Sequence, residues 1–316
     1  ALSCVVAVLA VTVGILVFLL LSPENKLKQC VEDRDWSAAA GLYEDRFRGE
    51  EKKEEKAGEI LREAVDALRE EFAAGTMDYP TVKRHLKGIE DFWDDSYVED
   101  ALDFVRELND SREAFEEAEQ CMGREEYEDA IRLYGEVADF DPAYGSAREK
   151  METAKDRYKE KLLGEAQAYT EIGDYDSAIG LVEEGLEVLA GDAELKSRLD
   201  ELQGEQVQYR VDAVLKEAAG YAGQGSYYDA LEEVREGLLE NAGNGKLEAA
   251  LKEYSEKYKQ DILKKAEEAA GTDENYEAAI LVFDSALNTL DGDYAQIEQA
   301  IREKREEYVQ LQLEKS

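Results

Sequence analysis

A short sequence pattern recurs six times along the chain at a spacing of nearly fifty residues. In each copy an aromatic residue is followed three positions later by a small or compact residue. The aromatic residues are Trp36, Tyr79, Tyr127, Tyr175, Tyr227 and Tyr276, which are separated by 43, 48, 48, 52 and 49 residues. Self-similarity at this period is typical of repeat proteins, in which each unit buries its apolar face against its neighbours. The sequence therefore predicts a repeat array.

The apolar positions within each copy have the spacing of a helix. The position three residues after the aromatic residue holds Ala39, Val82, Ala130, Ala178, Ala230 and Ala279. The position seven residues after it holds Tyr43, Leu86, Tyr134, Val182, Val234 and Phe283. Residues three and four positions apart lie on one face of an α-helix. We therefore expect a helix to start near each aromatic residue.

Turn-forming residues precede three of the aromatic residues directly. They are Gly173-Asp174, Gly225-Ser226 and Asp273-Glu274-Asn275. Glycine suits a tight turn, and Asp, Ser and Asn are favoured where a helix starts. A second apolar stripe lies before the turns, as at Tyr144, Ala147, Met151, Ala154, Tyr158 and Leu162. Each copy therefore predicts helix, tight turn and helix, with first helices of about 25 residues and second helices of about 15.

These joints resemble those of the tetratricopeptide repeat (TPR) family. Units of that family carry an aromatic residue after a turn such as "GDY", with an alanine three residues later, as Tyr175 and Ala178 do here. TPR units repeat about every 34 residues, whereas these repeat near 48, and the glycine and tryptophan signature of the TPR first helix is missing. The resemblance implies an all-α solenoid of about six helix-turn-helix repeats over residues 22–316. It also implies a concave surface that binds a protein or peptide.

Residues 1–21 form an uncharged apolar run, ALSCVVAVLAVTVGILVFLLL. A helix of about 20 apolar residues crosses a hydrocarbon core of about 30 Å. Ser22 and Pro23 come next and favour the start of a new helix. We therefore expect a transmembrane helix over residues 1–21. A cleaved signal peptide is the alternative, although its apolar core usually has only about 7 to 15 residues.

The orientation of this span depends on the charges at both of its flanks, and the sequence shows only the flank that follows it. That flank contains Lys26 and Lys28 among acidic residues. A single N-terminal span before a long acidic helical region favours a repeat region outside the cytoplasm. We expect a single-pass membrane protein with an extracytoplasmic repeat region, and the cytoplasmic orientation is the alternative.

Acidic residues dominate the charge of the chain. It contains 76 Asp and Glu residues against 38 Lys and Arg residues, for a formal net charge of −38. Such a surface repels phosphate backbones and anionic lipid headgroups, which argues against nucleic-acid binding. The acidity fits a salt-rich habitat, a cation-rich cell wall or a basic partner, and composition alone does not separate these three explanations.

Cys30 and Cys121 each lie six residues before an aromatic residue of the pattern, so they occupy one position in two repeats. Equivalent positions in different repeats are not expected to touch. We interpret both as small core residues and expect no disulfide between them. The three cysteines of the chain form no C-x-x-C cluster, which argues against a zinc site.

The sequence lacks the patterns of an active site. His85 is the only histidine, which argues against Ser-His-Asp and Cys-His arrangements. Carboxylates are so frequent that a pair of them indicates no particular general acid. The stretches DFDPAYG and DGDYAQ begin like EF-hand loops, but they lack the glycine and the final glutamate at the required spacing. We expect a non-catalytic protein with no cofactor and no metal site.

The acid excess and the tyrosines together suggest the kind of partner. Tyrosines beside carboxylates suit a basic peptide, and we expect Tyr169, Tyr221 and Tyr228 to contact one. The alternative is that the charge only keeps the protein soluble and the tyrosines fill the core. The predicted function is a membrane-anchored scaffold for protein–protein interaction at the cell envelope. A structural cell-division or cell-shape protein with rod-like repeats, and the sensor half of a membrane enzyme with an upstream catalytic domain, are the alternatives.

Overall fold

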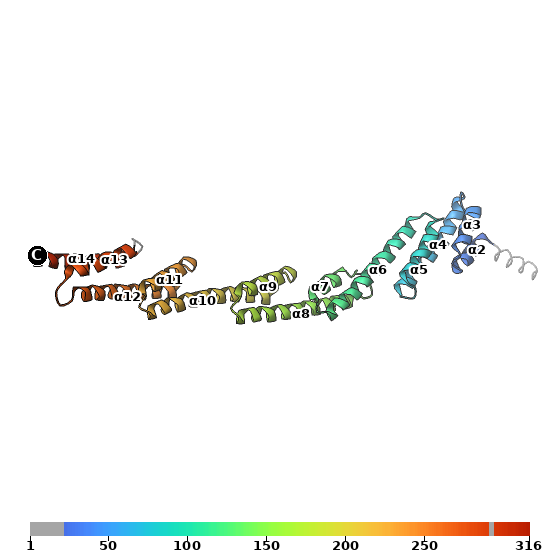
Figure 1. The fold of residues 1–316 in the computed structure, drawn as a ribbon. Helices are drawn as coiled ribbons and strands as arrows, with labels where there is room; N and C mark the ends of the chain where they lie inside the picture. Colours follow the sequence, from blue (N-terminus) through green and yellow to red (C-terminus); the bar gives the residue numbers. More distant parts are fainter. Residues whose placement is uncertain (1–21, 291–293) are drawn as a thin grey trace, which may run out of the picture. The chain divides into compact units, whose positions relative to one another are not determined.

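The computed structural model describes residues 22–290 and 294–316. These residues form thirteen α-helices and no strand, so the predicted all-α class is confirmed for them (Figure 1). The chain divides into two compact units, residues 1–160 and 161–316. The helices are α2 (Pro23–Glu32), α3 (Trp36–Arg46), α4 (Glu51–Ala73), α5 (Tyr79–Glu90), α6 (Ser96–Gly123), α7 (Tyr127–Glu136), α8 (Tyr144–Glu171), α9 (Tyr175–Val188), α10 (Ala193–Gly223), α11 (Tyr227–Glu240), α12 (Gly245–Ala270), α13 (Tyr276–Leu290) and α14 (Ala295–Lys315).

The second helix of every repeat begins at the aromatic residue of the pattern. Each of the six aromatic residues is the first residue of its helix, namely α3, α5, α7, α9, α11 and α13. The side chain three residues later is 0% exposed at all six joints, and the side chain seven residues later is at most 6% exposed. The helix starts and the buried helix face that the sequence predicts are therefore confirmed.

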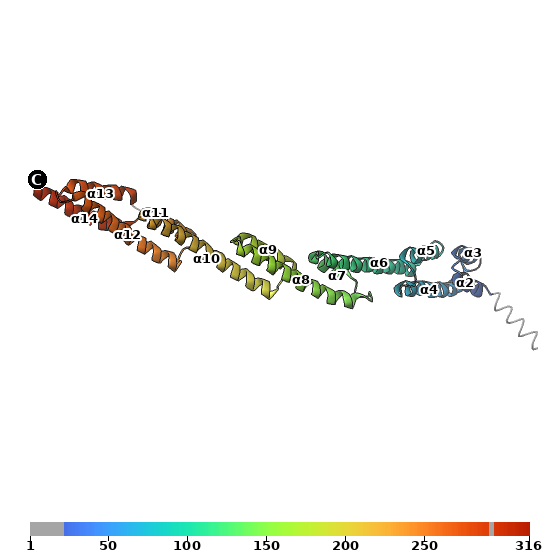
Figure 2. The same cartoon turned by 60° about the horizontal axis from the view of Figure 1, so that its bottom comes forward.

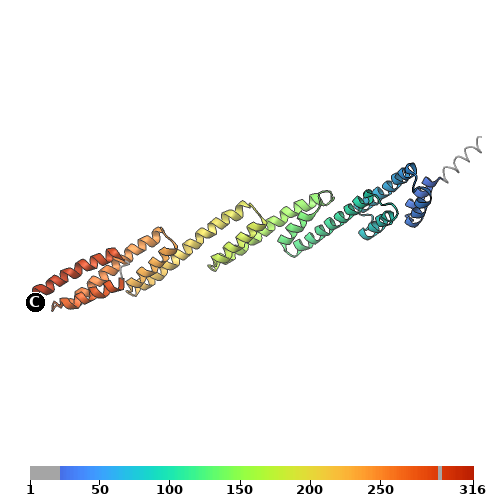
Figure 3. The same ribbon diagram turned by 90° about the horizontal axis from the view of Figure 1, so that it is seen from above.

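Long and short helices alternate from α4 to α13 as the sequence predicts, whereas α2, the first helix of the first repeat, has 10 residues instead of about 25. The long helices α4, α6, α8, α10 and α12 have 23 to 31 residues. The short helices have 10 to 15 residues. In the second unit, α10 packs against α11 and α12 against α13, and both pairs lie side by side in Figures 2 and 3. Consecutive helices therefore pack together in this unit, and in the first unit α4 also packs against α6.

The same capping motif ends the first helix at every joint. At five joints the residue two positions before the aromatic residue has a positive φ, and these residues are Arg34, Glu125, Gly173, Gly225 and Glu274. The next residue donates its N–H to the carbonyl six positions before the aromatic residue, at N···O distances of 2.8–3.0 Å. This pairing is the Schellman motif, which closes the last turn of a helix.

The second joint contains the same motif two residues earlier in the repeat. Gly75 has a φ of 73°, and Thr76 donates its N–H to the carbonyl of Glu71 at 3.0 Å. Two additional residues therefore separate the left-handed position from Tyr79. Asp78 caps the second helix of this joint, and its carboxylate accepts a hydrogen bond from the N–H of Thr81 at 2.8 Å.

Side-chain caps begin most of the short helices. Asp35, Asp174 and Asn275 each accept a hydrogen bond from the backbone N–H three residues later, at 3.0 to 3.2 Å. Such a bond satisfies one of the N–H groups that a helix start leaves free. Ser226 occupies the same position, as the sequence predicts, but its side chain makes no capping hydrogen bond.

Two glycines permit close helix packing in the second unit. A Cβ atom at Gly185 would overlap Leu162 Cδ1, and one at Gly237 would lie 2.7 Å from Val214 Cγ1. Both glycines lie ten residues after the aromatic residue of their joint. They therefore mark one repeat position at which the short helix contacts a side chain of the preceding long helix.

The start of α2 agrees with the sequence analysis. Ser22 is the N-cap residue, its hydroxyl accepts from the N–H of Asn25 at 3.2 Å, and Pro23 occupies the first helical position. Within residues 22–290 and 294–316, no helix is both long and apolar enough to cross a membrane. The predicted transmembrane helix over residues 1–21 lies outside the described residues and stays a prediction.

Candidate interaction surface

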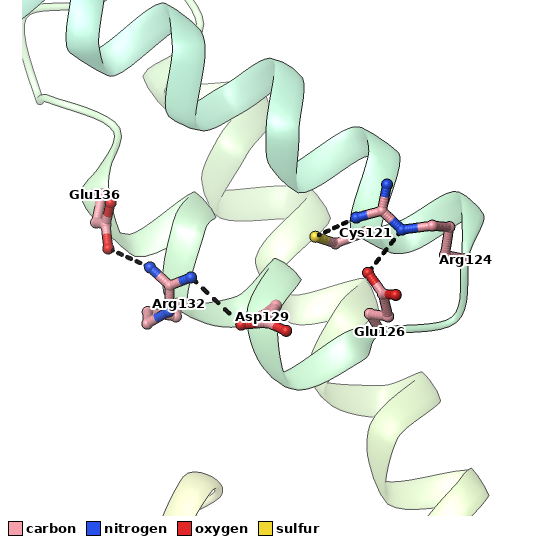
Figure 4. Close-up of polar contacts among 6 residues, drawn as sticks. All are labelled: Cys121, Arg124, Glu126, Asp129, Arg132 and Glu136. Atoms are coloured by element: carbon pink, nitrogen blue, oxygen red, sulfur yellow. Dashed lines mark hydrogen bonds and ion pairs between the residues drawn. The ribbon is translucent and has the colours of Figure 1, made fainter.

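The turn between α6 and α7 shows how polar side chains cover a joint (Figure 4). Arg124, three residues before Tyr127, donates from Nε to Glu126 at 2.7 Å and from Nη2 to the sulfur of Cys121 at 3.4 Å. On α7, Arg132 pairs with Asp129 at 3.3 Å and with Glu136 at 2.7 Å. The turn therefore presents paired, solvated charges to its surroundings.

The turn between α8 and α9 has an apolar residue at the position of Arg124. The other joints with the common spacing carry Asp33, Gln224 and Asp273 there, whereas this joint carries Ile172. The Ile172 side chain is 76% exposed. This joint therefore exposes an apolar side chain where the others carry a polar one.

Two exposed tyrosines lie at the same turn as Ile172. Tyr169, in the last turn of α8, is 39% exposed, and Tyr209, on α10, is 52% exposed. A Cβ atom at Gly173 would lie 2.8 Å from the Tyr209 hydroxyl oxygen, so Tyr209 reaches the residue next to Ile172. We call Tyr169, Ile172 and Tyr209 the turn patch.

The backbone beneath the turn patch is fixed by several contacts. Asp174 donates its N–H to the carbonyl of Tyr169 at 2.9 Å. Its carboxylate accepts from the N–H and the hydroxyl of Ser177 at 3.1 and 2.7 Å, and these bonds lower the pKa of Asp174. The ring of Tyr175 lies 5.3 Å from the ring of Tyr209 between centroids. The turn backbone and the Tyr209 ring are therefore held in place by contacts within the chain.

The three tyrosines that the sequence analysis selected lie in different surroundings. Tyr169 belongs to the turn patch. Tyr221 is half-buried against the core of the second unit, and Tyr228 is half-buried with its ring 5.8 Å from that of Tyr258. Ile172 and Tyr209 were not among the predicted site residues. An apolar residue at a repeat position that is polar in other joints was the signal for Ile172, whereas no repeat position marked Tyr209.

Hollows between neighbouring helices offer a second kind of surface. One hollow of about 640 Å³ in the second unit lies between α12 and α14, and its apolar lining comes from Leu251, Tyr294 and Ile297. Another of about 320 Å³ in the first unit lies between α2 and α4, beside Trp36. Both hollows also contain acidic and basic side chains, including the Arg34–Glu71 pair in the second of them.

The residues considered for catalysis have structural contacts. His85 accepts a hydrogen bond at Nδ1 from Trp36 Nε1 at 2.9 Å. Cys30 is half-buried and Cys121 is buried, both thiols are free, and burial raises the pKa of each. In the part of the chain that the structure describes, no group of three or more His, Cys, Asp or Glu side chains is arranged to hold a metal ion.

The fold and its joints define an all-α protein built from consecutively packed helix pairs. Comparison with protein-family models, with curated proteins and with solved structures returned no match. The surfaces of this chain therefore give the indications of its function.

Proposed function

We propose that this chain is a non-catalytic, membrane-anchored scaffold whose TPR-like solenoid binds a protein partner at the cell envelope. The observation that carries the proposal is the turn patch. Single exposed apolar side chains are common on protein surfaces, but a cluster of them rimmed by polar residues is typical of interaction sites. Three such side chains lie at one turn here, because Ile172 follows Tyr169 by three residues and precedes Gly173, against which Tyr209 packs.

The repeat architecture supports a binding role. Each helix pair buries its apolar face against its neighbours, which leaves the turns and outer faces free to vary. The turn between α8 and α9 varies in this way, because Ile172 occupies a position that holds a polar residue at equivalent turns. The backbone of the turn is fixed by the Schellman motif and the Asp174 cap. Binding of a partner therefore costs little conformational entropy of this backbone.

The surroundings of the nucleophilic side chains favour binding over catalysis. Nδ1 of His85 accepts a hydrogen bond from Trp36, which favours a packing role for the imidazole. The raised pKa of the Cys30 and Cys121 thiols reduces the thiolate fraction on which cysteine nucleophiles depend. These contacts support a structural role for the three residues.

Site-specific photo-crosslinking in the native membrane tests the proposal. A benzophenone amino acid replaces Ile172 in the full chain, and the matched control replaces Leu281, which is 64% exposed on α13. We expect one reproducible covalent adduct with another protein from position 172 and none from position 281. Equal adducts at both positions, or none at either, would contradict the proposed scaffold function.

A further inference from the structure

We propose that the turn patch binds a basic segment of a protein partner, in which Lys or Arg side chains flank an apolar one. This inference rests on the scaffold function proposed above and adds the chemistry of the partner. The apolar side chain would lie against Ile172, and the cations would lie over the tyrosine rings and beside the carboxylates around them.

Acidic residues outnumber basic ones around the turn patch. Residues 171–188, which span the turn and α9, contain six acidic residues and no basic one. The six are Glu171, Asp174, Asp176, Glu183, Glu184 and Glu187. The cation at this site is Arg210 on α10, which pairs with Asp176 at 3.3 Å. A basic segment gains from this field in both encounter rate and affinity.

The tyrosine rings suit the same partner. A Lys or Arg cation over an aromatic face is attracted by the electron-rich face of the ring. This chain makes such contacts internally, with Arg148 lying 5.1 Å from the Tyr144 ring centroid and Lys257 lying 5.4 Å from that of Tyr254. Tyr169 and Tyr209 are exposed at the turn, where a partner's cation can reach their rings.

Two other occupants of an apolar patch fit these charges less well. An anionic membrane surface would meet the six carboxylates with charge of the same sign. A second copy of this chain would bring a formal net charge of −38 to the contact. Like charges brought together without compensation oppose association, so a basic partner is favoured over both.

Fluorescence anisotropy on the purified full chain in uncharged detergent tests this inference. The probe is a labelled amphipathic peptide with Lys and Leu at helical spacing, and its counterpart has Glu in place of Lys. We expect the Lys peptide alone to bind, and to bind less tightly as NaCl rises from 50 to 500 mM, because salt screens exposed charges.

Matched variants locate the binding site. Ile172→Ser with Tyr209→Ser should weaken binding of the Lys peptide about tenfold, because the double change removes the proposed apolar contact and one of the two aromatic contacts. Leu239→Ser is the control, because Leu239 is 80% exposed on α11, which is also strongly acidic. It should change binding less than about twofold, as expected for an exposed residue outside the site. Circular dichroism of each variant verifies that its helices are intact.

Three results would overturn the inference. The first is an equal loss of affinity in the patch variant and the control, which would mean that the general acidic field binds the peptide. The second is binding of anionic vesicles, or of a second copy of the chain, that requires the turn patch. The third is a crosslinked partner at position 172 whose contacting segment is acidic or uncharged. In that last case the scaffold function stands while the basic partner is rejected.

Discussion

At the scale of the residue, His85 links two helix pairs of the first unit. It lies on α5 and accepts a hydrogen bond from Trp36, the first residue of α3. Burial, together with the charges of Arg34 and Arg84, lowers the pKa of His85, and Glu71 acts in the opposite direction. The neutral imidazole is the form that accepts this bond, because a protonated Nδ1 carries its own hydrogen.

Stability should therefore fall as the pH drops below the ordinary His pKa of 6.5. The folded pKa lies below that value, so the unfolded chain binds more protons over the interval between the two pKa values, and protonation favours unfolding. We expect a lower melting temperature at pH 5.5 than at pH 7.5 and a smaller difference in His85→Gln. An identical pH difference in the two proteins would contradict this role of His85.

At the scale of the element, the helix caps combine one backbone geometry with different residues. The left-handed position is glycine at Gly173 and Gly225, but it is Arg34, Glu125 and Glu274 at three other joints. A left-handed conformation costs a non-glycine residue about 1–2 kcal/mol. Part of that cost is offset because glycine loses more chain entropy on folding.

Glu125→Gly should therefore stabilise the protein, by about 0.5–1 kcal/mol. Glu125 is exposed and has a φ of 61°, a conformation that glycine adopts without strain. Gly225→Ala is the reverse experiment, because an added Cβ there meets no atom within 4 Å and the change tests backbone strain alone. Urea unfolding that shows a loss of stability in Glu125→Gly would contradict this account of the caps.

The close contact of α11 with α10 gives another prediction at this scale. Gly237→Ala should destabilise the second unit by about 1–3 kcal/mol, because the added Cβ would lie 2.7 Å from the β-branched Val214 side chain. Gly220→Ala is the matched control on α10, since its Cβ would meet no atom within 4 Å. Thermal melts in which both variants behave alike would exclude close packing at Gly237.

At the scale of the whole molecule, the described repeat region has its own start and its own core. The α2 helix begins with the Ser22 cap, and the core of the first unit includes Leu27 as its first described residue. Deleting residues 1–21 should therefore move the protein from the membrane fraction to the soluble fraction with its helical circular dichroism intact. Loss of the helical signal, or retention in the membrane, would contradict the predicted anchor.

The sequence by itself determined the helix starts and the buried faces of the short helices. Tyr175 and its counterparts begin these helices, and Ala178 and its counterparts are fully buried. Both features follow from interactions over a few residues, namely helical periodicity and the chemistry of turns, so they can be read from the pattern. The alternation of long and short helices follows for the same reason.

Only the tertiary structure decided which side chains remain exposed. Tyr169 and Tyr221 occupy one repeat position, yet Tyr169 is exposed and Tyr221 is half-buried. Tyr209 joins the turn patch from α10, more than 30 residues after Ile172, through the fold of the second unit. Exposure depends on which helices pack over a residue. Contacts between residues distant in the sequence determine that packing. The physical reason is that a helical pattern specifies a face, whereas the neighbour that packs on that face is specified by the fold.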